Sequence, residues 1–115
     1  MATYPEQHAH IQALIKALSK ELSGPLSGFF QLHQRSITDG ALPRKTKELM
    51  ALAIGIAAHC DGCIAYHVHD SLAAGASRAE VLETIGIAIM MGGGPALIYG
   101  CEALEALNEF QAQTK

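Results

Sequence analysis

The segment from Cys60 to His67 places two thiols and an imidazole at spacings that coincide on a helix. At about 100° per residue, Cys60, Cys63 and His67 fall within about 60° of one another around the helix axis. Two sulfurs one turn apart can approach disulfide range, and an imidazole four residues after Cys63 lies over that thiol. The pattern therefore indicates either a redox site or a metal site.

A redox role requires that a thiol be held as its thiolate, which is the reactive form. The first turn of a helix would direct free N–H groups and the positive end of its dipole toward Cys60 and Cys63. His67, one turn on, could take the proton or pair with the thiolate. A carboxylate would then hold and charge the imidazole, by the logic of a base oriented by a third group.

The acids available for that role are Glu48, Asp61, Asp70, Glu80 and Glu83. Glu48 is the acid on a strongly apolar segment that runs directly into the dithiol segment. An unpaired buried charge is costly, so an acid there needs a partner. We therefore predict that Glu48 orients His67. The alternative is a surface acid that pairs with Lys45 or Lys47.

Zinc binding by Cys60, Cys63 and His67 is the second interpretation. A closed structural zinc site needs a fourth ligand, which could come from Glu48 or from another subunit. His69 falls about 180° from Cys60 around the helix, so it points the wrong way for this set.

Three other side chains that could do chemistry have less specific interpretations. His59 and His69 are interpreted as solvated or interface residues. Cys101 has no partner in the sequence pattern and is interpreted as a packed thiol. The Cys60–Cys63 pair could itself be two small buried hydrophobic residues.

Composition limits the setting of these residues. The 115 residues fit one domain, half of them are apolar, and the mean hydropathy is +0.19. A small domain buries a limited fraction of its surface, so the apolar surplus predicts a homo-oligomer. The net charge of −3 and the scattered basic residues argue against nucleic-acid binding. The longest apolar stretch, residues 49–58, is about half of a membrane span.

The cysteine count bears on the cellular compartment. No export signal is visible at the N-terminus, so we expect a cytoplasmic protein. Three cysteines in a reducing compartment argue against a structural disulfide framework. Cys-x-x-Cys is then more plausibly a working dithiol or a metal site.

Apolar residues recur at three and four positions throughout, which predicts an all-α domain of about six helices. The expected helices span about 5–22, 25–35, 44–58, 60–74, 78–91 and 95–111. The third is apolar nearly all round and is therefore expected to be central. Ser77 and Glu80 predict a capping box at the start of the fifth. In the last, Leu97, Leu104, Leu107 and Phe110 are expected to face inward.

Glu48 stands twelve positions before Cys60-x-x-Cys63, and His67 stands four after the second cysteine. This combination, with helix breakers on either side, resembles the alkylhydroperoxidase D branch of the carboxymuconolactone decarboxylase family. The similarity extends over about residues 42–110 and includes Gly-Ala-Ser-Arg-x-Glu and Met-Gly-Gly-Gly-Pro. All four site positions match, within one domain that spans residues 1–115.

The resemblance implies an all-helical subunit in a homo-oligomer, expected to be a hexamer built as a trimer of dimers. It implies reduction of a hydroperoxide by Cys60 and Cys63, with Glu48 and His67 relaying protons. One cysteine would become a sulfenic acid, the other would resolve it as a disulfide, and an external dithiol or disulfide reductase would restore both. No metal or organic cofactor is expected.

The identity of the peroxidatic cysteine stays open at this point. His67 favours Cys63, whereas the helix end favours Cys60. A redox-sensing dithiol module and a lactone decarboxylase are alternatives, although true decarboxylases of this fold generally lack the dithiol. Fold alone does not fix the function.

Overall fold

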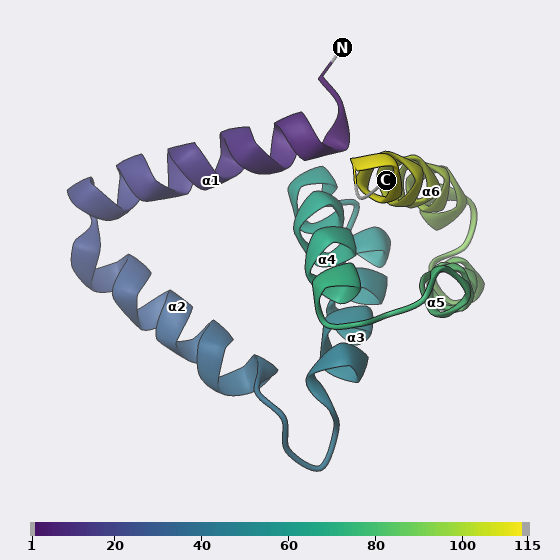
Figure 1. The fold of residues 1–115 in the computed structure, drawn as a ribbon, viewed down its shortest axis with the longest axis horizontal. Coiled ribbons are helices and arrows are strands. Elements are labelled where there is room, and N and C mark those ends of the chain that lie inside the picture. The colour runs from purple at the N-terminus through teal and green to yellow at the C-terminus, as the bar shows by residue number, and fades with distance from the viewer. Residues whose placement is uncertain (1, 114–115) are drawn as a thin grey trace.

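Six helices make up most of residues 2–113, the part of the chain that this computed structural model describes (Figure 1). They are α1 (Tyr4–Glu21), α2 (Ser23–Ile37), α3 (Arg44–Ala57), α4 (Asp61–Ala73), α5 (Arg78–Gly92) and α6 (Gly94–Gln113). The described residues contain no strand, so the all-α prediction is confirmed. Each expected helix is present, with its ends within two residues of the prediction.

Capping boxes mark the starts of two of the helices. The Ser77 side chain accepts a hydrogen bond from the Glu80 N–H, and the Glu80 carboxylate accepts one from the Ser77 N–H. The predicted capping box of α5 is therefore confirmed. Thr3 and Glu6 form the same arrangement at the start of α1. Beyond the end of α4, Gly75 has φ +96°, a conformation that favours glycine.

Helix α3 is the central element of the core, as predicted from its nearly continuous apolar sequence. It packs on α4, α5 and α6, and its most extensive contact is with α4. The largest wholly buried side chains of the core come from these four helices: Leu52, Ile56, Ile64, Val68, Val81 and Leu107. Burial of such apolar side chains is the main source of folding free energy. The interface between α3 and α4 is therefore a well-packed part of the core.

The α5–α6 interface depends on small residues of α6. An added Cβ at Gly100 would lie 3.0 Å from Ile89 Cδ1 and 3.1 Å from Ile85 Cγ2, so no larger residue fits there without rearrangement. The expectation that Leu97 and Leu104 face inward is wrong, because their exposed fractions are 49% and 38%. Close helix packing uses the small face of α6 and leaves these larger side chains outside.

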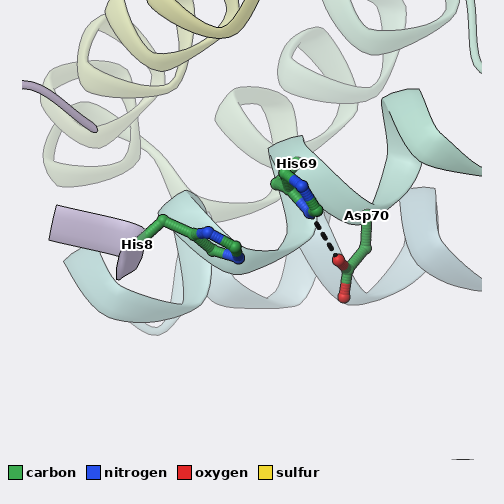
Figure 2. A group of neighbouring side chains, drawn as sticks. All are labelled: His8, His69 and Asp70. Carbon is green, nitrogen blue, oxygen red and sulfur yellow. Dashed lines mark hydrogen bonds and ion pairs between the residues drawn. The ribbon is translucent and has the colours of Figure 1, made fainter. Parts of the chain in front are cut away.

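Helices α1 and α2 diverge from the group formed by α3 to α6 (Figure 1). Helix α1 contacts α4 and α6. His8, in the first half of α1, packs against His69 of α4 (Figure 2). Helix α2 has no buried residue, and its Phe29 is 58% exposed. None of the described helices combines the length and the apolar character that crossing a membrane requires.

Candidate redox site

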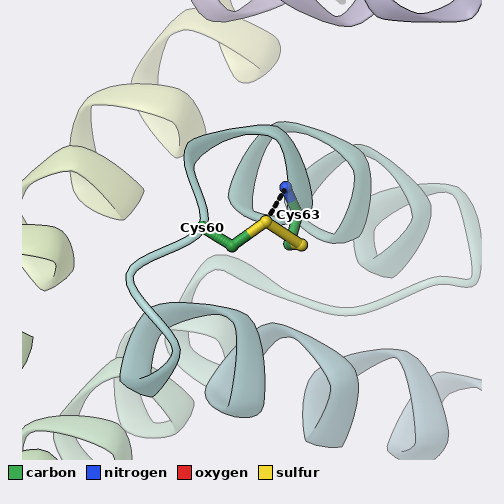
Figure 3. The surroundings of a disulfide bond; sticks show 2 residues. All are labelled: Cys60 and Cys63. Carbon is green, nitrogen blue, oxygen red and sulfur yellow. Dashed lines mark hydrogen bonds between the residues drawn. A yellow bond between two sulfur atoms is a disulfide. The ribbon is translucent and has the colours of Figure 1, made fainter.

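Cys60 and Cys63 form a disulfide at the start of α4 (Figure 3). Cys60 is the N-cap residue, and its Sγ accepts a hydrogen bond from the Cys63 backbone N–H at 3.2 Å. Both side chains are partly buried. The N-terminal end of a helix stabilises negative charge, so in the reduced protein the same N–H would favour a thiolate at Cys60.

Gly55 of α3 lets Cys63 approach the neighbouring helix closely. A Cβ added at Gly55 would lie 3.0 Å from the Cβ of Cys63, so a side chain there would push against the second cysteine. Gly55 is itself buried. The absence of a side chain at this position therefore allows the dithiol to lie against α3.

Glu48 and His67 pair across the same helix interface. The Glu48 Oε1 lies 3.0 Å from the His67 Nδ1, and the Glu48 side chain is wholly buried. Glu48 and His67 are therefore in hydrogen-bond contact, as predicted from the sequence. The surface-acid interpretation is wrong, because Lys45 pairs with Glu80 at 2.9 Å and Lys47 donates to the Thr38 carbonyl.

The second carboxylate oxygen of Glu48 is held less tightly. Oε2 has no hydrogen-bond partner among residues 2–113, but the Arg44 Nε lies 3.7 Å away. A buried carboxylate without compensation is costly, and the nearby guanidinium reduces this cost. Glu48 is therefore positioned to accept a proton or to stabilise a protonated His67.

The thiols and the Glu48–His67 pair lie along one interface. Glu48 and Gly55 are seven residues apart on α3, which is about two turns, so they share one side of that helix. Cys63 and His67 are one turn apart on α4 and face these two positions in the opposite order. The antiparallel α3–α4 pair thus presents a sulfur at one level and the acid–base pair at the next.

Helix α1 contacts the two residues between the cysteines, a feature that the sequence reasoning missed. The Tyr4 hydroxyl donates to Asp61 Oδ1 at 3.3 Å. A Cβ added at Gly62 would lie 3.2 Å from Ile11 Cδ1. Burial, followed by the charge of Asp61, raises the pKa of the Tyr4 hydroxyl. Tyr4 therefore stays a protonated donor at neutral pH.

Asp61 also interacts with a carboxyl group of α6, that of Glu102. A hydrogen bond with Asp61, then burial and the charge of Asp61, raise the pKa of Glu102 to about 7. Like charges so close cannot both ionise at low cost, so Glu102 keeps its proton to a higher pH than an ordinary glutamate. The first turn of α4 therefore has an ionisable carboxyl pair beside the N-cap cysteine.

A second cluster on α4 contains His69 and Asp70 together with His8 from α1. The His69 Nδ1 lies 2.9 Å from Asp70 Oδ1, and the His69 ring stacks on His8 with centroids 4.2 Å apart. Burial lowers the pKa of His8, with a smaller contribution from His69. His69 is partly exposed, and sequence reasoning gave no signal for its contact with His8.

Two further side chains differ in how well the sequence predicted them. Cys101 is an exposed free thiol, so its interpretation as a packed thiol is wrong. His59, directly before the N-cap cysteine, has φ +59° and stacks on Tyr99 with centroids 4.8 Å apart. His59 is exposed, in agreement with its interpretation as a solvated or interface residue.

Comparison with known proteins places this arrangement in a family. The family model described as the carboxymuconolactone decarboxylase family matches residues 26–106, which is more than half of the chain. The chain belongs to the carboxymuconolactone decarboxylase family. The dithiol with Glu48 and His67 is consistent with the alkylhydroperoxidase D-like branch.

Individual relatives of this family agree in sequence and fold. An uncharacterized protein of Cupriavidus necator is 36% identical over 95 residues, covering 80% of this chain and 84% of that protein. A carboxymuconolactone decarboxylase family protein of Legionella pneumophila has a TM-score of 0.89 at 43% identity and covers 93% of this chain and 96% of its own.

One solved relative from Thermotoga maritima is described as a carboxymuconolactone decarboxylase family protein possibly involved in antioxidative response. It matches with a TM-score of 0.81 at 31% identity, covering 90% of this chain and 91% of that chain. The six-helix fold is therefore that of this family.

Proposed function

We propose that this protein is a thiol-dependent hydroperoxidase that can also act as a disulfide reductase, with Cys60 and Cys63 as the redox pair. The observation that carries the proposal is the Cys60–Cys63 disulfide at the start of α4, on the same interface as the 3.0 Å Glu48–His67 pair. A dithiol beside an acid–base pair has what peroxide reduction requires. The antioxidative role suggested for the Thermotoga maritima relative is in keeping with this chemistry.

The first step is attack by one thiolate on the outer oxygen of a hydroperoxide. An S–O bond forms while the O–O bond breaks, the sulfur is oxidised to a sulfenic acid, and the alkoxide takes a proton. His67 supplies that proton after having accepted it from the thiol. Glu48 holds His67 in place and stabilises its positive charge.

The second step closes the disulfide. The other thiolate attacks the sulfenic sulfur, an S–S bond forms, and the hydroxyl leaves as water after taking a proton. An external dithiol then reduces the disulfide by exchange, so that both cysteines return to thiols and the donor leaves oxidised. The same exchange step would serve disulfide reduction.

We further propose that the working unit is a homo-oligomer, with a hexamer built as a trimer of dimers as the expected form. Support comes from large apolar side chains that the single chain leaves in contact with solvent, among them Phe29, Ile54, Met90 and Met91. Large exposed apolar areas commonly mark protein interfaces. Helix α2, which has no buried residue, would gain a partner in such an assembly.

The test of the redox cycle is stopped-flow consumption of cumene hydroperoxide by the reduced protein. A Cys101→Ser background removes the exposed third thiol. Cys60→Ser and Cys63→Ser should each abolish turnover with an external dithiol, and the variant that keeps the peroxidatic cysteine should still react once. Intact-mass measurement should show the loss of two hydrogens within residues 60–63 after one equivalent of peroxide. Consumption at the parent rate by both variants would overturn the mechanism.

A further inference from the structure

His8, His69 and Asp70 bring together two imidazoles and a carboxylate from two different helices (Figure 2). One potential ligand atom from each lies within 4.8 Å of the others. This cluster is separate from the dithiol, because the cysteines lie at the start of α4, whereas His69 and Asp70 lie about two turns further along α4 and His8 lies on α1. The proposed redox cycle uses none of the three.

His8 is the least explained member of the cluster. Its side chain is only 7% exposed, and its Nε2 has no hydrogen-bond partner among residues 2–113. The rings of Tyr66 and Phe110 pack against it, so its position is fixed. A buried polar atom left without a partner destabilises a protein, and natural proteins rarely retain one without a purpose.

We propose that His8, His69 and Asp70 form a binding site for a divalent transition-metal ion, with Zn²⁺ as the ion of choice. Imidazole nitrogens with one carboxylate are a donor set that suits Zn²⁺, and three protein ligands leave a coordination position for solvent. The ion would give Nε2 of His8 the partner that the protein does not supply. The carboxylate of Asp70 would offset part of the ionic charge.

The ligand atoms must adjust their spacing to bind one ion. Zinc bonds of about 2.0–2.2 Å place neighbouring ligands of a tetrahedron about 3.3–3.6 Å apart. His69 and Asp70 supply this adjustment, because their side chains are 44% and 22% exposed. Their hydrogen-bonded Nδ1 and Oδ1, now 2.9 Å apart, would open to this spacing if both atoms bind the ion. His69 must turn out of its stack with His8, and the same exposure gives the ion a path from solvent.

Binding is tested by titrating Zn²⁺ into the chelator-treated protein and measuring the heat. The protein is used with its Cys60–Cys63 disulfide intact and with Cys101→Ser, so that no thiol competes for the ion. We expect one equivalent to bind. His8→Gln and His69→Gln should each weaken binding at least about tenfold. Asp70 is left unchanged because it also lies within 4.8 Å of the Glu48–His67 pair.

The matched control is His10→Gln, which removes an exposed histidine from the same helix as His8. It should bind Zn²⁺ as the parent does. Thermal unfolding adds a second readout: Zn²⁺ should raise the unfolding temperature of the parent but not of His69→Gln, whose partly exposed side chain can be replaced without unfolding the core. The proposal would be overturned if the parent bound no stoichiometric Zn²⁺. It would also be overturned if His8→Gln and His69→Gln bound Zn²⁺ as tightly as the parent does.

Discussion

The Nδ1 of His67 lies 3.0 Å from the Oε1 of Glu48 across the α3–α4 interface. When the carboxylate is ionised it only accepts hydrogen bonds, so Nδ1 then carries the hydrogen of this pair. In that tautomer the lone pair of the imidazole is on Nε2, the nitrogen that would accept a proton from a thiol in the proposed cycle. The buried acid thus selects the tautomer as well as the orientation of the base.

Glu48→Gln should slow peroxide-dependent thiol oxidation by about 10²-fold or more, because the amide can hold His67 in the wrong tautomer and cannot offset its positive charge. Stopped-flow rates and circular dichroism of the same samples separate this effect from misfolding. Glu83→Gln, an exposed acid on α5, should react at the parent rate. An unchanged rate for Glu48→Gln would remove Glu48 from the mechanism.

Gly55→Ala should destabilise the protein by about 1–3 kcal/mol, since the new methyl group would lie 3.0 Å from Cys63 Cβ in a packed interface. Gly86→Ala is the matched control, because Gly86 also lies within a helix and nothing stands within 4 Å of its added Cβ. The control should gain about 0.4–1 kcal/mol. Urea unfolding measures the free energy of unfolding of both variants. Equal changes in the two variants would contradict the close approach of Gly55 to Cys63.

Glu102 should make folding stability depend on pH. Its pKa rises from 4.5 in the unfolded chain to about 7 in the folded protein, because of a hydrogen bond with Asp61, its burial and the negative charge of Asp61. The stabilising contribution is fully present below about pH 4.5 and is lost as the pH rises through about 7.

Relative to Glu102→Gln, the parent should therefore lose stability between pH 4.5 and 7. Partial exposure screens the interaction and limits the loss to less than about 1 kcal/mol. Urea unfolding at several pH values measures it, with Glu83→Gln as the control that should follow the parent. A parent that gains stability over this interval relative to Glu102→Gln would contradict the raised pKa of Glu102.

Phe29→Asp should weaken self-association by about tenfold or more, because a charge would be placed in an apolar contact between subunits. Light scattering after size-exclusion chromatography would show a smaller particle at low concentration. Gln34→Asp adds the same charge at an exposed polar position of α2 and should leave the mass unchanged. A parent that is monomeric at high concentration would end the oligomer proposal.

Local signals allowed the sequence to predict the helices and the pairing of Glu48 with His67. Caps such as Ser77 and Glu80 involve neighbouring residues, so their chemistry is visible in a short window. Glu48 was identified because an acid on an apolar helix needs a partner, and the partner lay on the next helix of the chain. Both inferences depend on contacts between adjacent elements.

Contacts between distant segments could not be predicted in this way. The Tyr4–Asp61 hydrogen bond spans 57 residues, and the His8–His69 stack joins the first helix to the fourth. Periodicity identifies an apolar face without saying what covers it. For α6 the small face was buried, so the larger Leu97 and Leu104 were assigned to the wrong side.

The contacts of Tyr4 and Ile11 with Asp61 and Gly62 restrict how the redox properties of the dithiol can be altered. In dithiol proteins the two intervening residues are the obvious positions for engineering the reduction potential. In this chain a side chain added at position 62 would press on Ile11 Cδ1 of the amino-terminal helix, 3.2 Å from its Cβ. A redesign of position 62 is therefore best paired with a smaller residue at position 11, so that the first helix is not displaced.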